Sequence, residues 1–224
     1  MGNKKILIFS YARCGSTTLM NILNSQGLKL AFEPFSSNFN HYSFKLYKDG
    51  HFDLVLNKLD EKFDGFKHIS FHINDEKNKI FFERYKIVFL YRENPIEAAM
   101  SLALARKTSV FRKIYAQKEY FKKKFILDPE VVLELTLQAQ KHYKYLEQIE
   151  NPFVLSYEKL YNSDEETKYS NIEKLCDFAG IKITNDLIVK YWLDGQNHKL
   201  NNDFSNQIEN YDLICQYLSN KIDK

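Results

Sequence analysis

The stretch that decides the fold is residues 5–19, KILIFSYARCGSTTL, in which an apolar segment runs directly into a hydroxyl-rich turn. Residues 5–9 have the length and apolarity of a buried strand, and a helical pattern follows the turn. The first N–H groups of a helix have no intrahelical partner, and the helix dipole favours negative charge there. Arg13 adds a planar cation. Three hydroxyl groups come from Ser16, Thr17 and Thr18. We predict that this loop holds a phosphate-like group.

The loop lacks the lysine of a nucleoside-triphosphate P-loop, G-x-x-x-x-G-K-[ST]. In that register Ser10 stands at the first glycine, Gly15 at the second, and Ser16 replaces the lysine. Because that lysine neutralises the β- and γ-phosphates beside magnesium, a triphosphate–metal complex is poorly matched. Arg13 suits a less highly charged group. The alternative interpretation is an ordinary strand-to-helix turn with incidental hydroxyls.

A second apolar segment, residues 87–91, ends at Arg92 and has the continuous apolarity of an interior parallel strand. An alanine-rich pattern typical of a helix follows Pro95 and contains Ser101. Without a binding role, Arg92 would form a surface salt bridge with Glu93 or Glu97. Ser101 would then be an ordinary helix serine.

Both segments resemble the sulfotransferases that use 3′-phosphoadenosine 5′-phosphosulfate (PAPS). Residues 13–19 are similar to the 5′-phosphosulfate loop of bacterial and carbohydrate members, with Cys14 in place of the usual serine. Arg92 and Ser101 resemble the pair that clamps the 3′-phosphate, at the spacing of the bacterial Stf0-like group. The resemblance implies that PAPS is bound by Arg13, Cys14, Gly15, Ser16, Thr17, Thr18, Arg92 and Ser101. It also implies that Arg13 stabilises charge on the leaving phosphate.

Two residues are candidates for the general base. Glu33, in the segment Phe32-Glu33-Pro34-Phe35, resembles the glutamate that follows the second strand in Stf0-like enzymes. Pro34 predicts an extended backbone at Glu33, and a solvated turn is the alternative. His72 is the second candidate, because histidine is the base in many cytosolic sulfotransferases.

The segment 66–73 alternates as a strand would, with His68, Ser70 and His72 on one face. His68 is interpreted as a packed core histidine. Lys67, on the opposite face, could lie near the substrate, although a salt bridge with Asp64 or Glu61 is equally compatible with the sequence. Residues 156–160, SYEKL, resemble a segment after a late strand of many sulfotransferases, and we assign them no catalytic role.

The order of patterns predicts an α/β, P-loop-like three-layer fold with a central, mostly parallel sheet flanked by helices, in a single sulfotransferase domain over residues 1–224. Strands are expected near 5–10, 28–32, 66–73, 86–91 and 152–156. Helices are expected near 16–26, 52–63, 75–84, 95–107, 110–125, 129–149, 168–179, 184–193 and 206–221. Since ligands bind at the carboxyl ends of parallel strands, Arg13, Glu33, His72 and Arg92 should share one sheet edge.

Composition narrows the class of protein. The formal net charge of +3 argues against a dedicated nucleic-acid binder, and three scattered cysteines suit neither a disulfide framework nor a zinc site. No apolar stretch approaches a membrane span or a signal peptide, so we expect a soluble, cytoplasmic protein without a membrane partner. The basic stretch Arg106–Lys124, interleaved with aromatics, is either a solvated helix or a wall that guides anionic ligands.

These observations predict an enzyme that moves a sulfuryl group from PAPS to a hydroxyl acceptor, a carbohydrate or small metabolite, and releases 3′-phosphoadenosine 5′-phosphate (PAP). No metal is implied, because the transferred group carries less charge than a phosphoryl group and the PAPS reaction lacks a triphosphate. A homodimer is possible. The alternatives are a small-molecule kinase of the P-loop class and a catalytically inactive nucleotide-binding or regulatory protein.

Overall fold

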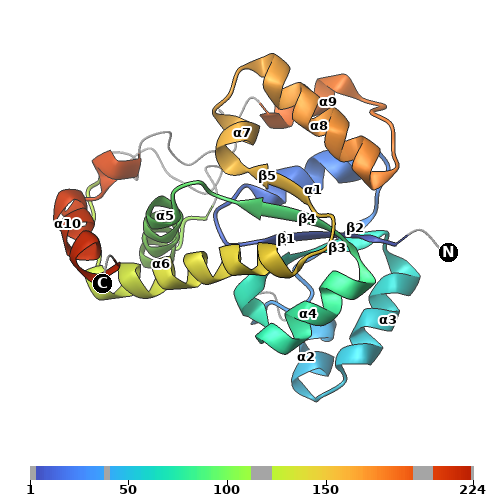
Figure 1. Ribbon diagram of the computed structural model, residues 1–224, viewed down its shortest axis with the longest axis horizontal. Coiled ribbons are helices and arrows are strands. Elements are labelled where there is room, and N and C mark those ends of the chain that lie inside the picture. The colour runs from blue at the N-terminus through green and yellow to red at the C-terminus, as the bar shows by residue number, and fades with distance from the viewer. Residues whose placement is uncertain (1–3, 38–40, 112–122, 194–203, 223–224) are drawn as a thin grey trace. The chain divides into compact units, whose positions relative to one another are not determined.

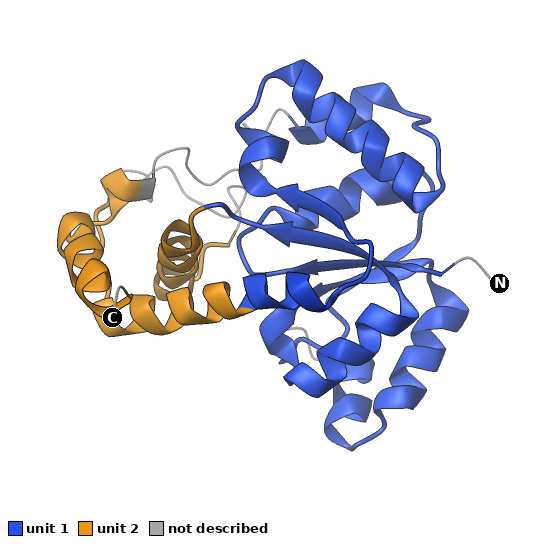
Figure 2. Ribbon diagram, in the orientation of Figure 1, with its two compact units in different colours: residues 1–93, 142–193 blue, residues 94–141, 194–224 orange. Residues whose placement is uncertain are grey.

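The computed structural model describes residues 4–37, 41–111, 123–193 and 204–222 (Figure 1). The chain forms two compact units, each built from two separate stretches of sequence (Figure 2). Unit 1 comprises residues 1–93 and 142–193, and unit 2 comprises residues 94–141 and 194–224. Unit 1 contains the whole sheet.

The sheet has five strands in the order β2-β3-β1-β4-β5, and each neighbouring pair is parallel. The strands are β1 (Ile6–Ser10), β2 (Leu30–Phe32), β3 (Gly65–Ile69), β4 (Lys86–Tyr91) and β5 (Phe153–Ser156). The chain builds β2 and β3 on one side of β1 and then crosses to the other side for β4 and β5. The winding therefore reverses at β1, the point at which open α/β sheets bind ligands.

Helices cover both faces of the sheet in unit 1, which confirms the predicted three-layer α/β architecture (Figure 1). One layer contains α1 (Ser16–Ser25), α7 (Tyr157–Tyr161), α8 (Glu165–Ala179) and α9 (Asp186–Leu193). The other contains α2 (Tyr42–Lys48), α3 (Phe52–Lys62) and α4 (Asp75–Arg84).

The alternation of side chains along β3 decides which layer each residue meets. Phe66 packs edge-on against Phe81 of α4, with ring centroids 5.3 Å apart, and His68 lies 5.1 Å from the same ring. Lys67, between them, therefore faces the α1 layer. The first residue of β3 is Gly65. A glycine is needed there because a Cβ would lie 1.8 Å from the carbonyl oxygen of Ile6.

The third strand is shorter than the sequence predicts. β3 ends at Ile69, and Ser70–His72 form a 3₁₀ turn instead of continuing to residue 73. The Ser70 carbonyl accepts a hydrogen bond from the Asn78 side chain at 2.7 Å, which turns the chain toward α4. The predicted shared face of His68, Ser70 and His72 is therefore wrong beyond Ile69, although His72 still follows the carboxyl end of the strand.

Two helices lie outside the ranges that the sequence predicts. α2 has no buried residue, so it lacks the apolar periodicity that reveals a helix. α7 is only five residues long, too short for that pattern, and is capped by Ser156, whose hydroxyl accepts from the Lys159 N–H at 3.1 Å. α8 begins earlier than predicted because Asp164 caps it, accepting from the Thr167 N–H at 2.8 Å.

Unit 2 is helical. It contains α5 (Pro95–Thr108), most of α6 (Pro129–Lys144) and α10 (Tyr211–Ile222). Two short 3₁₀ helices, Tyr145–Gln148 of unit 1 and Phe204–Gln207 of unit 2, replace predicted α-helical ends at 149 and 206. The predicted helix 110–125 falls mainly on 112–122, outside the described residues. Across the described ranges, no helix is long and apolar enough to cross a membrane.

Candidate functional site

The loop between β1 and α1 has an unusual backbone. Gly15 is the N-cap of α1 with φ +77°, and Arg13 also adopts a left-handed conformation, with φ +66°. A non-glycine residue in this region costs about 1–2 kcal/mol, so contacts elsewhere must hold the loop in this shape. The N–H groups at the start of α1 and the Arg13 side chain are groups that suit an anion, and anion binding by this loop stays a prediction.

The hydroxyls and the thiol of the loop differ in exposure. Ser16 is buried, whereas Thr17 and Thr18 are partly exposed. The Cys14 side chain is 1% exposed, and its Sγ lies 3.7 Å from the Ala12 carbonyl oxygen, which accepts from the thiol. Burial raises the pKa of Cys14 to about 12, against the opposing effect of Arg92. The thiol is therefore neutral and buried, and a contact of Cys14 with a ligand stays a prediction.

Glu33 follows β2 and is held in a tight turn. Its N–H donates to the Lys67 carbonyl at 3.1 Å, and its own carbonyl accepts from the Ser36 N–H at 3.0 Å. The backbone φ is +43°, so the extended conformation predicted from Pro34 is wrong. These two hydrogen bonds outweigh the local preference, and the side chain is aimed into the protein rather than solvated.

A buried ion pair connects Glu33 to the loop. The Lys67 ammonium contacts the Glu33 carboxylate, with Lys67 3% and Glu33 11% exposed along their side chains. Lys67 Nζ also donates to Thr17 Oγ1 at 3.0 Å and lies 4.4 Å from the centroid of the Phe32 ring. One lysine thus joins the candidate base to a hydroxyl of the candidate anion loop, across three separate segments of the chain.

His72 lies within electrostatic reach of this pair. Burial lowers the pKa of His72 to about 4; the Glu33 carboxylate opposes this effect and the Lys67 ammonium adds to it. His72 is therefore neutral at physiological pH. His68 is fully buried, with Nε2 3.1 Å from Asn78 Oδ1, and burial lowers its pKa well below the usual value. It is a core histidine, as expected.

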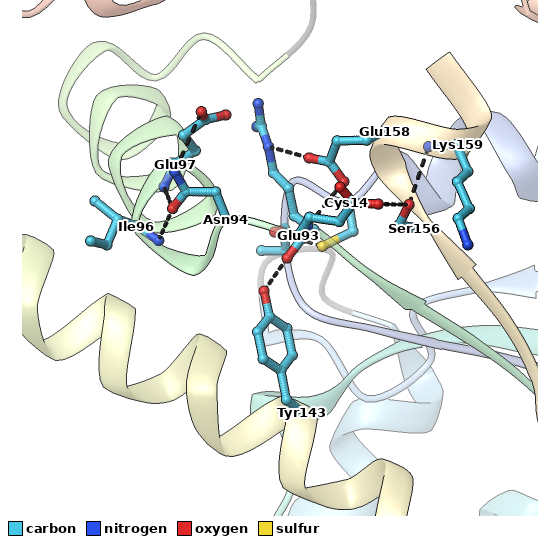
Figure 3. Close-up of polar contacts among 11 residues, drawn as sticks. Cys14, Glu93, Asn94, Ile96, Glu97, Tyr143, Ser156, Glu158 and Lys159 are labelled. Atoms are coloured by element: carbon cyan, nitrogen blue, oxygen red, sulfur yellow. Dashed lines mark hydrogen bonds and ion pairs between the residues drawn. The ribbon is translucent and has the colours of Figure 1, made fainter. Parts of the chain in front are cut away.

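Arg92 follows β4 and is surrounded by groups from α6 and α7. Its Nε lies 3.5 Å from Glu158 Oε1, and its guanidinium carbon lies 4.6 Å from the centroid of the Tyr157 ring. The Tyr143 hydroxyl donates to the Arg92 carbonyl. Figure 3 shows Tyr143 and Glu158 meeting this strand end from different sides. These contacts hold the guanidinium, whose side chain is 11% exposed.

The charges of Arg13 and Arg92 influence the same two side chains, Tyr157 and Cys14. Both cations lower the pKa of Tyr157, opposing the dominant effect of burial, which raises it. Both likewise oppose the burial that raises the pKa of Cys14. The guanidinium groups of Arg13 and Arg92, which follow the adjacent strands β1 and β4, therefore both act electrostatically on the surroundings of Cys14 and Tyr157. Two cations in this arrangement suit a ligand with two anionic groups.

The structure brings together most, but not all, of the predicted site within unit 1. Ser101 lies on α5 in unit 2, partly buried, and its pairing with Arg92 stays a prediction. The basic stretch Arg106–Lys124 lies largely outside the described residues. Among the residues that are described, no group of three or more His, Cys, Asp and Glu side chains is arranged to hold a metal ion.

Several of the described residues contact the candidate groups although the sequence patterns assign them no definite site role. Lys67 is compatible with two roles on sequence grounds, and Tyr157 and Glu158 resemble a structural segment. Tyr161 belongs to no motif. The spacing within residues 156–160 carries no sign that this segment packs beside Arg92, because that contact depends on the pairing of β5 with β4.

The comparison with protein families decides the class of this chain. A model described as "Sulfotransferase domain" matches residues 3–221. The chain belongs to the sulfotransferase domain family. No curated protein sequence matches this sulfotransferase-family chain significantly.

Solved structures with similarity to this sulfotransferase-family chain are distant. Mouse sulfotransferase SULT7A1 complexed with PAP is 13% identical, with a TM-score of 0.47, over 87% of this chain and 64% of the mouse chain. A sulfotransferase from Alicyclobacillus acidocaldarius is 15% identical, with a TM-score of 0.46, over 86% and 90%. Retinol dehydratase, complexed with retinol and PAP, is 13% identical, with a TM-score of 0.42, over 86% and 64%. The chain thus spans just under two thirds of the first and third structures.

Proposed function

We propose that this sulfotransferase-family chain transfers a sulfuryl group from PAPS to a hydroxyl group on a carbohydrate or small metabolite. The observation that carries the proposal is the buried contact of Lys67 with both Glu33 and Thr17. It joins a candidate base to the loop that would hold the 5′-phosphosulfate. Membership of the family supports the same chemistry.

In the proposed reaction the acceptor oxygen attacks sulfur in line with the leaving group. The bond between sulfur and the 5′-phosphate oxygen breaks, PAP leaves, and the acceptor proton passes to Glu33. Arg13 and the N–H groups at the start of α1 would stabilise the charge that develops on the phosphate. Lys67 would offer its ammonium to the oxygens of the transferred group. The reaction as written needs no metal.

Glu33 is the proposed base, and His72 is the alternative. A histidine with a pKa of about 4 is a weak base at neutral pH. If His72 were the base, kcat/KM would be flat from pH 8 to 5 and fall near pH 4, and His72→Asn would abolish turnover. With Glu33 as base, Glu33→Gln removes turnover while PAP still binds, and His72→Asn retains most of the activity.

The 3′-phosphate is assigned to Arg92 and Ser101. Their spacing, together with Glu33 after β2, supports a place near the Stf0-like group. We further propose a cytoplasmic enzyme, since PAPS-dependent transfer to small metabolites suits that compartment.

Isothermal calorimetry tests the PAPS site. PAP should bind the wild-type chain without metal, more tightly than ATP with magnesium. Arg92→Ala should weaken PAP binding by about 10- to 100-fold, the range for a hydrogen-bonded charged group. Arg84→Ala is the matched control, because Arg84 also pairs with a carboxylate, Asp60 at 2.5 Å, on the opposite helix layer.

Other outcomes identify the alternatives. Preference for ATP with magnesium, and no effect of Arg92→Ala, would favour a small-molecule kinase. Binding of PAP without turnover across hydroxyl acceptors, and with no effect of Glu33→Gln, would indicate an inactive nucleotide-binding protein.

A further inference from the structure

We infer that Tyr161 is a positioning residue that holds the loop between β1 and α1 in its anion-binding shape. The inference rests on the proposed function, because it assigns that loop to the 5′-phosphate of the nucleotide. Tyr161 is the last residue of helix α7 and lies 146 residues after Gly15 in the chain.

Tyr161 makes contact with the loop at two points. Its hydroxyl donates to the Gly15 carbonyl at 3.0 Å and also forms a hydrogen bond with the Thr18 side chain. Its ring occupies the space beside Gly15, where an added Cβ would lie 2.3 Å from Tyr161 Cε2. The residue is 5% exposed, and burial raises the pKa of the phenol, so the hydroxyl keeps its proton and acts as a donor.

The loop needs such support. Arg13 adopts a left-handed backbone conformation, which is strained for a residue with a Cβ, and the N-cap of α1 is Gly15, which has no side chain with which to cap the helix. Strained backbone of this kind persists only where the surrounding structure determines it. A binding loop that is already in its bound shape loses less entropy when the ligand arrives. Tyr161, which lies outside the loop, provides contacts that hold the loop in this conformation.

Helix α7 is itself anchored, so Tyr161 is a firm support. The Ser156 hydroxyl, which caps the helix, donates to Glu93 Oε1 at 2.8 Å. Glu158 Oε2 accepts from the Glu93 N–H at 2.9 Å (Figure 3). The start of α7 is thus fixed to the end of β4, and its last residue reaches the loop after β1. Leu160, fully buried, holds the helix against the core.

The test separates a role at the 5′-phosphate from general stabilisation. Calorimetry is run with PAP, 5′-AMP and 3′-AMP on wild type and Tyr161→Phe, which keeps the ring and removes the hydroxyl. Loss of one hydrogen bond at the loop should weaken PAP and 5′-AMP by about 3- to 10-fold. Binding of 3′-AMP should change less than about twofold. Tyr169→Phe, which removes a hydroxyl bonded to Asp186 at 2.7 Å, is the control.

Hydrogen exchange of the ligand-free protein provides a second readout. Amides of residues 13–17 should exchange faster in Tyr161→Phe, and those of β4 should not. Equal weakening of all three nucleotides would show a merely structural role, and unchanged affinity with unchanged exchange would overturn the inference. If the wild type binds no PAP, the proposed function fails, whereas the exchange experiment still decides whether Tyr161 holds the loop.

Discussion

Replacing Lys67 by methionine tests the ion pair at the centre of the site. The substitution keeps most of the aliphatic volume of Lys67 and leaves the Glu33 carboxylate buried without its cation. Breaking a buried pair in this way costs about 3–5 kcal/mol, because the remaining charge has lost its hydration and its partner. The low exposure of both side chains, 3% for Lys67 and 11% for Glu33, supports a value within that range.

The matched variants isolate the pair. Glu33→Gln removes the carboxylate but leaves Lys67 its bond to Thr17 at 3.0 Å, so its cost should be smaller. The double variant Lys67→Met/Glu33→Gln carries no buried charge and should recover about 2 kcal/mol or more relative to Lys67→Met alone. The gain measures the coupling between the two residues.

Urea unfolding at pH 7 is the assay, followed by far-UV circular dichroism and by fluorescence of Trp192, the single tryptophan of the chain. In parallel thermal melts the expected fall in Tm, for a chain of this length, is about 6–20 °C.

The reasoning is refuted by a small effect. If Lys67→Met lowers the free energy of unfolding by less than about 1 kcal/mol, the pair behaves as a solvent-exposed one. If the double variant is no more stable than Lys67→Met, the loss arises from packing around the lysine rather than from the carboxylate.

Two further predictions concern the loop and the core. Gly15→Ala should lower the free energy of unfolding by more than Gly180→Ala, since both glycines have φ near +75° but only Gly15 faces the Tyr161 ring. The left-handed backbone costs about 1–2 kcal/mol in both variants. Thermal melts of the two variants measure the additional loss at Gly15, and calorimetry shows whether PAP affinity falls with it. Burial lowers the pKa of His142 to about 3, despite a hydrogen bond between Nε2 and the Leu90 carbonyl at 2.9 Å. Its folded-state pKa is below the unfolded value, so the neutral ring stabilises the fold above pH 6.5, and up to about 5 kcal/mol is lost as the pH falls toward 3. His142→Gln should flatten that dependence in pH-resolved unfolding; an unchanged slope would contradict it.

The sequence alone determined the architecture and the edge of the sheet at which the candidate site residues lie. Residues 5–19 predict a strand, an anion-binding loop and a helix. Such predictions succeed because a strand and the start of a helix are encoded by residues that are close together in the sequence. The carboxyl ends of parallel strands meet at one edge, so the order of strands and loops along the chain is enough to predict that Arg13 and Arg92 lie together. The family resemblance predicts that Glu33, after the second strand, lies at the same edge.

Only the tertiary structure decided how these groups are held. Pro34 predicts an extended Glu33, but hydrogen bonds to Lys67 and Ser36 set its φ to +43°. Lys67 reaches Thr17 only because β3 lies beside β1 with α1 on that face. Tyr161 meets Gly15 across most of the chain. Such contacts depend on strand order and helix packing, and local patterns carry no information about which distant residue fills a given space.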